Sequence, residues 1–505
     1  MFRCRAQLVI AVGMAFAIGC AGAARSTTPT APVSPLTAHA PVDKPAAPSG
    51  KNQGAACPPA QQLDAAQLEA EAVCLLRQYV QIDTSNPPGN ELAAAAFLRG
   101  LLEREGIPVT VVESAPGRGN LLARWPNKAK PLIALAHHMD VVPVVVGAWS
   151  VPPFAATLRD GMLWGRGALD DKAGGIVSLL TLLMAKRLGI ELPYGTMFLA
   201  LADEEAGGGV GARDLLAKHP ELLRDVKYVM NEGGGIMELP DKHVLYQIEV
   251  AQKAPLWLRL TARGPAGHGS APSANMATAR LVRALARLAD HDFPTEVLPE
   301  VQALYARKAP SLAAPLREGA RDLRKALARP DFREAFLHDA HHAALVRNTL
   351  AISMLHGSDK ENVIPGEASA VLDMRLLPGQ DASQVQAEIV KLIADPAIEV
   401  QTLLSWTAHS SPHDTPLFRA IEARAQTRDP GAQVLANVIG GFTDCNAFRA
   451  HGITCYGFMP LRLAPDAFAG IHGNDERIRT STLGEAVIAW LELLRSVDAS
   501  AGPER

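Results

Sequence analysis

The chain has 505 residues, of which 48% are hydrophobic and 20% are charged, and its formal net charge is -3 at pH 7. A chain of this length exceeds one simple hydrophobic core, so two or three domains are expected. The composition is normal for a soluble globular enzyme. The near-neutral charge, without a polybasic block, argues against nucleic acid or an anionic membrane surface as a partner.

The N-terminal residues have the pattern of an export signal. Arg3 and Arg5 precede an apolar run over residues 6–18, which is too short to span a bilayer. The run ends in Gly-Cys-Ala-Gly, the pattern of a bacterial lipobox. Residues 1–20 are therefore interpreted as a signal peptide with Cys20 acylated, and ordinary cleavage a few residues later is the alternative. Either way we expect an exported protein of the periplasm or cell envelope, which contacts a membrane only through such a lipid.

The segment after the signal predicts a linker and possible disulfides. Residues 21–60 are rich in Ala, Pro, Thr and Ser, a composition that cannot bury a core and is typical of a flexible linker. Cys57 and Cys74 could pair in an oxidising compartment, and so could Cys445 and Cys455. For the second pair, buried free thiols are the alternative.

Short apolar runs predict buried strands, and three of them end in polar residues that can bind a metal. These are residues 132–136 before His137-His138-Met139-Asp140, 196–202 before Asp203-Glu204-Glu205, and 226–230 before Asn231-Glu232. A less distinct run covers residues 453–458, and helical patterns cover 173–188 and 211–219. Strands that alternate with helices indicate an α/β fold with a mostly parallel central sheet. Ligands bind such sheets at the carboxyl ends of the strands.

Residues 254–410 have the different pattern of an α+β unit. Strands are predicted over 256–260, 350–355 and 368–376, and helices over 274–289 and 382–393. Between them, residues 291–347 form a charged helical insertion interrupted by prolines. His338, His341 and His342 cluster in this insertion, and we interpret them as the solvated face of a helix instead of a metal site.

The strand-end residues suggest metal chemistry. Glu204 and Glu205 have no packing reason to end a buried strand, because paired like charges repel and are costly to desolvate. A metal ion explains them, since one glutamate can bind the cation while its neighbour accepts a proton from water. Asp140 stands two residues after His138, a spacing in which a carboxylate can orient a metal-binding imidazole. Asp170 can bridge two cations, although a helix N-cap is the alternative.

Together these stretches resemble the dinuclear zinc carboxypeptidases and aminoacylases, a family that includes glutamate carboxypeptidase, succinyl-diaminopimelate desuccinylase and carboxypeptidase S. The matching segments are HMDVVP from 138, GRGALDDK from 165, DEE from 203, NEGG from 231, GPAGHGSAP from 264, NVIP from 362, DMR from 373, GGFTD from 440 and IHGNDERI from 471. The resemblance implies a catalytic zinc-peptidase domain of residues 61–253 and 411–505, interrupted by a lid and dimerisation domain of residues 254–410.

The resemblance also implies the metal ligands. His138 and Glu232 would hold one zinc ion, Glu205 and His472 would hold the other, and Asp170 would bridge them. Two zinc ions per subunit are therefore expected. Cobalt or manganese could substitute at such a mixed set of imidazoles and carboxylates.

Further roles follow from the same resemblance. Asp140 would orient the metal-binding imidazole, and Glu204 would be the general base. His268 would reach the active site of a partner subunit and stabilise the oxyanion, so a homodimer is expected. Arg375 and Asn362 would lie near the substrate carboxylate, a task that suits the planar fork of an arginine.

Glutamate at position 232 accompanies carboxypeptidase or aminoacylase activity in this family, whereas aspartate accompanies aminopeptidase activity. The insertion before Arg347 resembles the carboxypeptidase S branch, which takes hydrophobic peptides or N-acyl amino acids. We therefore predict hydrolysis of the amide bond of small peptides or N-acyl amino acids that carry a free carboxylate. The alternatives are an aminopeptidase or dipeptidase of the same fold and, from another class, an inactive lipid-anchored binding protein.

Overall fold

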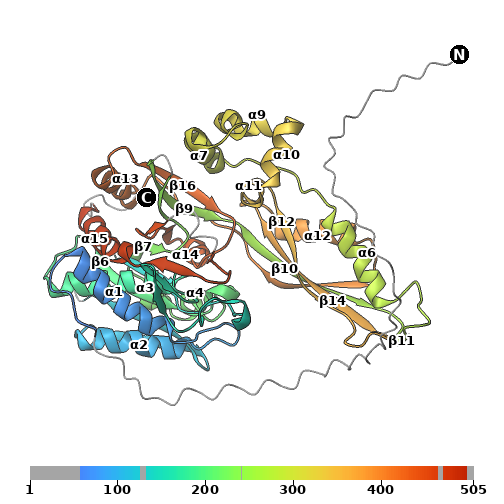
Figure 1. The fold of residues 1–505 in the computed structure, drawn as a ribbon, viewed down its shortest axis with the longest axis horizontal. Coiled ribbons are helices and arrows are strands. Elements are labelled where there is room, and N and C mark those ends of the chain that lie inside the picture. The colour runs from blue at the N-terminus through green and yellow to red at the C-terminus, as the bar shows by residue number, and fades with distance from the viewer. Residues whose placement is uncertain (1–56, 126–131, 240–241, 464–469, 498–505) are drawn as a thin grey trace, which may run out of the picture. The chain divides into compact units, whose positions relative to one another are not determined.

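The computed structural model describes residues 57–125, 132–239, 242–463 and 470–497, so the predicted signal peptide and almost all of the predicted linker lie outside the described residues. Its largest element is a sheet of ten strands (Figure 1). In spatial order these are β1 (Val109–Ala115), β2 (Arg118–Arg124), β6 (Gly195–Leu201), β3 (Leu132–His138), β7 (Val226–Asn231), β17 (Thr454–Gly457), β9 (Val244–Gln252), β8 (Gly235–Glu238) and β18 (Arg462–Leu463), while β16 (Gln433–Ile439) also pairs with β9.

The centre of this sheet is parallel. β3 pairs in parallel with β6 and β7, and β7 pairs in parallel with β17. Antiparallel pairs flank this core, so the sheet as a whole is mixed. Every residue of β6 is buried, which explains why its sequence is nearly continuously apolar instead of alternating. The predicted α/β class is confirmed, and two further parallel pairs, β16 with β9 and β18 with β8, lie toward one edge of the sheet.

Helices cover both faces of the large sheet. Alternate side chains of β6 belong to different hydrophobic clusters: Phe198 and Ala200 to one, and Met197, Leu199 and Leu201 to the other. Successive side chains of a strand point to opposite faces, so the two clusters lie on opposite sides. The first includes α1 (Ala65–Val80), α2 (Glu91–Arg104), α3 (Lys172–Arg187), α13 (Pro416–Arg428) and α15 (Ser481–Ser496). The second includes α4 (Ala212–Lys218), α5 (Pro220–Leu223) and α14 (Cys445–Ala450).

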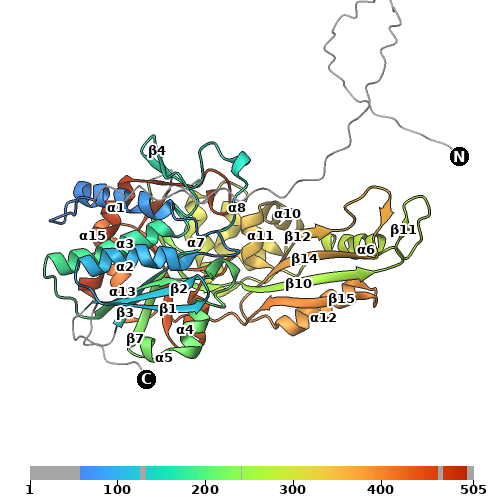
Figure 2. The same ribbon diagram turned by 90° about the horizontal axis from the view of Figure 1, so that it is seen from below.

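A second sheet begins where β9 ends. After Lys253 the chain continues as β10 (Ala254–Arg263), part of an antiparallel sheet in the order β12 (Thr349–His356), β14 (Glu367–Leu376), β10 and β15 (Ile398–Ser405). Helices α6 (Ala277–Ala289) and α12 (Ala382–Ile393) contact each other and share its core. Figure 2 shows these strands side by side, extending away from the large sheet.

Two small sheets complete the strand inventory. One pairs β11 (Gly267–His268) with β13 (Val363–Ile364) beyond the far end of β10. The other joins β4 (Thr157–Arg159), β5 (Met162–Trp164) and β19 (Arg477–Arg479). Because β5 and β19 are distant in sequence, their pairing brings the chain after residue 164 next to the chain before residue 477.

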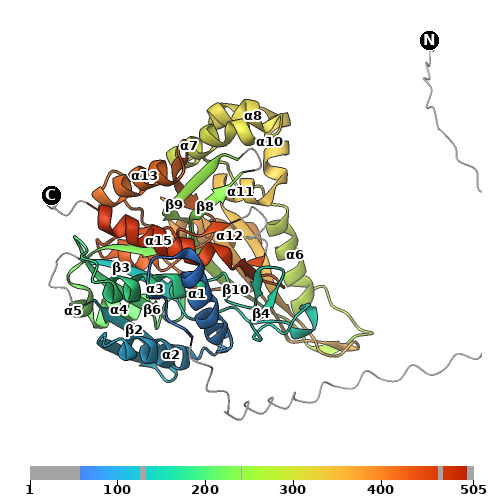
Figure 3. The same cartoon turned by 60° about the vertical axis from the view of Figure 1, so that its left-hand side comes forward.

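The insertion is helical, as predicted, but it packs with the large sheet. Its helices are α7 (Pro299–Lys308), α8 (Leu316–Gly319), α9 (Leu323–Leu327), α10 (Pro330–His338) and α11 (Ala340–Val346). Its buried aromatic residues Tyr305, Phe332 and Phe336 belong to the hydrophobic cluster of the large sheet, not to that of the four-stranded sheet. α7 contacts β16, and Figure 3 shows this group of helices beside β9. The insertion therefore broadens the large sheet's core.

Two disulfide bonds link elements of the large sheet's layer. Both predicted cysteine pairs are disulfide-bonded: Cys57 with Cys74 in α1, and Cys445 in α14 with Cys455 in β17.

Within the described ranges, no helix has both the length and the apolar character needed to cross a membrane.

A buried ion pair joins α14 to β9. Two nitrogens of Arg449 each lie 2.6 Å from a carboxylate oxygen of Glu249, and both side chains are buried. Glu249 also accepts a hydrogen bond from the main-chain nitrogen of Gly457 at 3.1 Å. The pair therefore connects α14, β9 and β17 across the sheet.

Replacing Arg449 with Met should lower the free energy of unfolding by about 3–5 kcal/mol, because the Glu249 carboxylate would stay buried without its partner. Urea unfolding followed by circular dichroism measures the change. Arg329→Met is the control, since Arg329 pairs with Asp331 at an exposed surface and its loss should leave the unfolding midpoint unchanged. Equal midpoints for the two variants would refute a special contribution of the buried pair.

Candidate active site

Polar side chains from three adjacent strands meet at one edge of the large sheet. His138 is the last residue of β3, Glu232 directly follows β7, and Glu204 and Glu205 occupy a short 3-10 turn after β6. Because β3 lies between β6 and β7 and is parallel to both, the carboxyl ends of the three strands lie side by side. The structure thus brings the predicted strand-end residues together.

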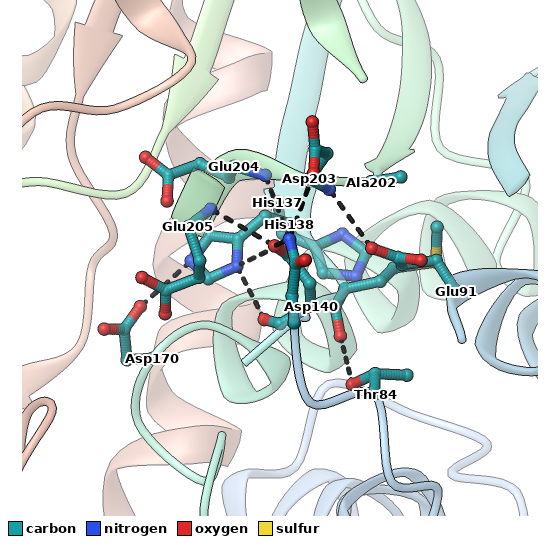
Figure 4. A network of polar contacts seen from close by, with 12 residues as sticks. Thr84, Glu91, His137, His138, Asp140, Asp170, Ala202, Asp203, Glu204 and Glu205 are labelled. Atoms are coloured by element: carbon teal, nitrogen blue, oxygen red, sulfur yellow. Dashed lines mark hydrogen bonds and ion pairs between the residues drawn. The ribbon is translucent and has the colours of Figure 1, made fainter. Parts of the chain in front are cut away.

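Two further side chains reach this edge from loops. Asp170 precedes α3, and His472 precedes β19. Asp170 lies between two imidazoles, with Oδ1 2.9 Å from Nε2 of His138 and Oδ2 3.3 Å from Nε2 of His472. The same nitrogen of His472 is 3.0 Å from a carboxylate oxygen of Glu205. Figure 4 shows Asp170 and Glu205 beside the imidazole of His138.

Five of these residues form two overlapping groups that could hold metal ions, and His472 belongs to neither group. His138, Asp170 and Glu205 make up one group, and His138, Glu204 and Glu232 make up the other, with the ligand atoms of each group within 4.8 Å of one another. In the part of the chain that the structure describes, neither group includes a histidine of the insertion, namely His338, His341 or His342. Asp170, whose two oxygens face different histidines, is placed to bridge two cations.

The hydrogen bonds of His138 orient its ring for a cation. Nδ1 lies 2.9 Å from the main-chain oxygen of Asp140, which can only accept, so Nδ1 carries a hydrogen. Nε2 then faces the carboxylate of Asp170, where a proton or a metal ion must lie between the two atoms. Burial lowers the pKa of His138, but hydrogen bonds to Asp140 and Asp170 outweigh it and raise this pKa well above its usual value.

The Asp140 carboxylate holds the turn that carries the glutamate pair. Its Oδ1 accepts a hydrogen bond from the main-chain nitrogen of Glu204 at 3.1 Å, and its Oδ2 accepts one from that of Glu205 at 3.2 Å (Figure 4). The amide of Asn86 donates to Oδ2 at 2.8 Å. The carboxylate is 3.6 Å from Nδ1 of His138, farther than the main-chain oxygen of the same residue. Asp140 therefore positions both the imidazole and the glutamates.

The site concentrates buried negative charge. Burial, reinforced by nearby carboxylates, raises the pKa of Glu204, Glu205 and Glu232 above the usual range. Oε1 of Glu204 is buried and has no hydrogen-bond partner among the described residues. Carboxylates crowded in this way are costly unless cations neutralise them. The donor set, imidazole and carboxylate together, therefore fits divalent metal ions.

Glu476 organises the loop that carries Asp170, a role that the sequence analysis did not assign. Its buried carboxylate accepts a hydrogen bond from the Arg166 guanidinium at 2.7 Å. It also accepts hydrogen bonds from the main-chain nitrogens of Gly167, Leu169 and Asp170, at 3.0, 2.7 and 3.0 Å. One carboxylate therefore fixes the backbone around Asp170. Its place in a matching segment was a signal, but its partners could not be read from spacing.

A second unpredicted network supports the glutamate turn. Arg118 donates to both carboxylate oxygens of Glu91, at 2.6 and 2.7 Å, and to Asp203 at 2.8 Å. Asp203 has a φ of 70°, in the left-handed region that is uncommon for residues other than glycine. The network holds this turn just before Glu204. Its members are far apart in the sequence, so no local pattern could have found them.

The other predicted residues lie at opposite ends of β10. Arg375 lies opposite Pro255, at the end next to the large sheet. His268 lies beyond the other end in β11, and Asn362 directly precedes β13 and accepts a main-chain hydrogen bond from Gly269. At about 3.3 Å per residue, the 10 residues of β10 span roughly 30 Å. The structure therefore brings His268 and Asn362 together, but keeps them far from Arg375 and from the metal-binding groups of the same chain.

A parallel-sheet edge that gathers histidines and carboxylates in this way defines a metallohydrolase, and comparisons with known proteins agree. The family model described as Peptidase family M20/M25/M40 matches residues 134–496. The chain is 28% identical over 386 residues to human N-fatty-acyl-amino acid synthase/hydrolase PM20D1, covering 74% of this chain and 75% of that relative. It is 26% identical over 440 residues to aminoacylase-1 of Sus scrofa, covering 85% and 96% of the two chains.

Solved structures share the fold. The M20 family metallo-carboxypeptidase Sso-CP2 from Sulfolobus solfataricus matches with a TM-score of 0.68 at 21% identity, covering 85% of this chain and 99% of that one. The chain belongs to peptidase family M20/M25/M40, which confirms the resemblance found in the sequence. It is an amide-bond hydrolase of a family of metal-binding enzymes.

Replacing Glu476 with Gln should lower the free energy of unfolding by about 3 kcal/mol or more, because Arg166 would remain buried without a counter-charge. The metal content after dialysis should fall as well, because Asp170 loses its support. Urea unfolding and elemental analysis measure the two effects. Glu485→Gln is the control, since Glu485 is half exposed where it pairs with Arg428. Full stability with unchanged metal content would contradict the role of Glu476.

Proposed function

We propose that this protein is a dinuclear zinc hydrolase that cleaves the amide bond of N-acyl amino acids or small peptides with a free carboxylate. The observation that carries the proposal is the convergence of two imidazoles and four carboxylates at the edge where parallel strands end. Among the described residues, Oε1 of Glu204 has no hydrogen-bond partner there. The names of two relatives, an N-fatty-acyl-amino acid hydrolase and an aminoacylase, support the substrate class. Glutamate instead of aspartate at position 232 supports it over aminopeptidase action.

The metal ligands follow from the placement of the side chains. His138 and Glu232 would hold one zinc ion, Glu205 and His472 would hold the other, and Asp170 would bridge them. The mixed donor set suits zinc, with cobalt or manganese as substitutes. When bound, such ions lower the pKa of water and polarise a substrate carbonyl. Proton transfer remains the task of the protein's own groups.

Glu204 is the proposed general base and acid. Its Oε1 is available because it has no hydrogen-bond partner among the described residues. A carboxylate at this position can accept a proton from water and deliver it to the leaving amine. Asp140 fixes its backbone through the 3.1 Å hydrogen bond, which keeps the carboxylate aligned.

A homodimer would complete the site. His268 and Asn362 lie too far along β10 to act in their own subunit's site, but a partner subunit could supply them, with His268 stabilising the oxyanion. The edge strand β12 exposes Ile352, Met354 and Leu355 with 40%, 49% and 60% of their surface accessible. An apolar edge strand is a template for pairing with a second copy, which supports the dimer.

The predicted carboxylate contact of Arg375 has a competitor. Nε and Nη2 of Arg375 donate to Asp373 at 2.6 and 3.0 Å, and its guanidinium lies 4.6 Å from the ring of Phe442. If Arg375 binds the substrate carboxylate, its guanidinium must do so while it also donates hydrogen bonds to Asp373, or after it has released them.

Export is the proposed cellular route. The disulfides Cys57–Cys74 and Cys445–Cys455 support an oxidising compartment, because such bonds are rare in reducing ones. Acylation of Cys20 and a periplasmic or envelope location stay predictions from the sequence.

Replacing Glu204 with Gln should reduce kcat by about 10²–10⁴-fold on an N-acyl amino acid, because the variant cannot accept the proton of water. Its bound zinc, measured by elemental analysis, should match that of the wild type. Glu221→Gln, at an exposed position, is the control and should retain full activity. Near-normal turnover in the Glu204 variant would remove Glu204 from the mechanism.

The shared site can be tested by mixing inactive dimers. His268→Ala and Glu204→Gln should each be inactive alone. After exchange of subunits, half of the dimers combine the two chains and carry one intact site of two, so activity should return to about a quarter of wild type. Absence of recovery, with subunit exchange verified by native mass spectrometry, would refute a histidine contributed by the partner.

A further inference from the structure

The side chain of Asn86 joins two carboxylates at the active-site edge, and the proposed function gives it no role. Its Nδ2 lies 2.8 Å from Oδ2 of Asp140 and 3.1 Å from Oδ1 of Asp203. All three side chains are buried. Ionised carboxylate oxygens only accept hydrogen bonds, so the amide must turn its NH2 group, and not its oxygen, toward both acids. One neutral group therefore donates a hydrogen bond to each of two buried carboxylates.

Both carboxylates belong to the polypeptide around the glutamate turn. Asp140 accepts hydrogen bonds from the main-chain nitrogens of Glu204 and Glu205, at 3.1 and 3.2 Å. Asp203 directly precedes these residues and has the left-handed φ of 70°. Asp140 lies shortly after β3, whereas Asp203 lies shortly after the neighbouring strand β6. The Asn86 amide therefore connects the chain beyond two adjacent strands of the sheet.

Hydrogen-bond donors, and not a strong ion pair, hold the Asp140 carboxylate. Within the described residues, its one ion-pair partner is the imidazole of His138, at 3.6 Å. Of the three N–H donors that it accepts from, two belong to the turn of Glu204 and Glu205 itself. The third donor, Asn86, comes from a different loop and has the shortest contact, at 2.8 Å. Asn86 therefore fixes the direction of the carboxylate that in turn fixes the turn.

Main-chain contacts hold the segment around Asn86 independently of its side chain. The main-chain nitrogen of Asn86 donates to the oxygen of Val141 at 2.9 Å. The hydroxyl group of Thr84 donates to the main-chain oxygen of Met139 at 2.7 Å. Removing the amide should therefore leave the path of this segment unchanged, so the task of the side chain can be separated from the folding of the loop.

We propose that Asn86 is a positioning residue for amide hydrolysis, whose NH2 group holds the Asp140 carboxylate in the orientation that fixes the main chain of Glu204 and Glu205. This assignment rests on the proposed function, in which Glu204 transfers protons. Without the amide, the Asp140 carboxylate can rotate away from the turn. Misplacement of a catalytic group by about 1 Å can cost about 10²-fold in rate, so a residue that acts only through Asp140 can still control turnover.

Hydrogen exchange tests the assignment without relying on activity. Asn86→Leu keeps the approximate shape of the side chain and removes the NH2 group. The main-chain N–H groups of Glu204 and Glu205 should then exchange about tenfold faster or more, as measured by mass spectrometry of peptides that contain them. Exchange in β6 should stay within about twofold of the wild type, because the hydrogen bonds between strands do not involve Asn86. Asn86→Ala leaves room for a water molecule that can donate instead, so its effect should be smaller.

Asn90→Leu is the matched control, because it makes the same change on the same loop. Asn90 is exposed, and its amide donates to the main-chain oxygen of Asp83 at 3.2 Å, away from both carboxylates. Its replacement should leave exchange at Glu204 and Glu205 unchanged. In turnover of N-acetyl-L-alanine, Asn86→Leu should lower kcat about tenfold to a hundredfold and change KM less than about threefold, because it disturbs the general base and not substrate binding. The control should change neither constant.

Three results would overturn the assignment. The first is unchanged exchange at Glu204 and Glu205 in both Asn86 variants. The second is equal acceleration throughout β6, which would indicate a structural role. The third is faster exchange of the turn with full kcat. Wild-type enzyme that hydrolyses neither N-acetyl-L-alanine nor a dipeptide would count against the proposed function instead, and the exchange rates would still decide whether Asn86 positions the turn.

Discussion

Carboxylates crowded at the ends of buried parallel strands are the constraint on which the rest of this structure depends. Glu205, Glu232 and Asp170 occupy a space where burial and mutual repulsion both disfavour the ionised state. Other charges around the cluster have partners within the protein. Arg166, for example, forms an ion pair with Glu476, and Glu476 accepts a hydrogen bond from the main chain of Asp170. Cations then need to balance only the central cluster. Hydrogen bonds thus hold the backbone that carries Asp170, while the negative charge of the central carboxylates has no balancing group among the described side chains other than the imidazoles.

The continuity of β9 and β10 sets the geometry between the two sheets. One continuous chain segment forms both strands. β9 belongs to the large sheet, and β10 runs from the large sheet toward His268. The strand length makes these two regions unable to meet within one chain. The insertion packs with the large sheet near β16 and so adds bulk to the catalytic layer. The lobe beyond it presents an apolar edge, which is suited to a second subunit.

Charge and aromatic surface meet at the junction between the sheets. Trp406 and Phe442 lie 5.1 Å apart between ring centroids, with Arg213 stacked on one ring and Arg375 on the other. The two guanidinium groups differ in their ion pairs, because Asp373 pairs with Arg375 and not with Arg213.

Much of the fold was predictable because its signals are local. The apolar run of β6 and the polar residues after it follow from burial of a parallel strand, and the α/β class with its separate α+β unit followed from such patterns. The positions His138 and Glu205, which are candidate metal ligands, were predicted in the same way and through the ordered motifs. The packing of the insertion with the large sheet was not predictable, because sequence position alone grouped it with the α+β unit.

The sequence by itself determined the family, the amide-bond chemistry and the residues that gather at the strand ends, because each of these is written in short contiguous segments. Only the tertiary structure decided which guanidinium pairs with which carboxylate, that Glu476 supports Asp170, and that the helical insertion packs with the large sheet. Those relations join residues from distant parts of the chain, and packing, not spacing, sets their distances. The burial pattern of a strand depends on its own residues, whereas an ion pair depends on how separate elements pack against each other.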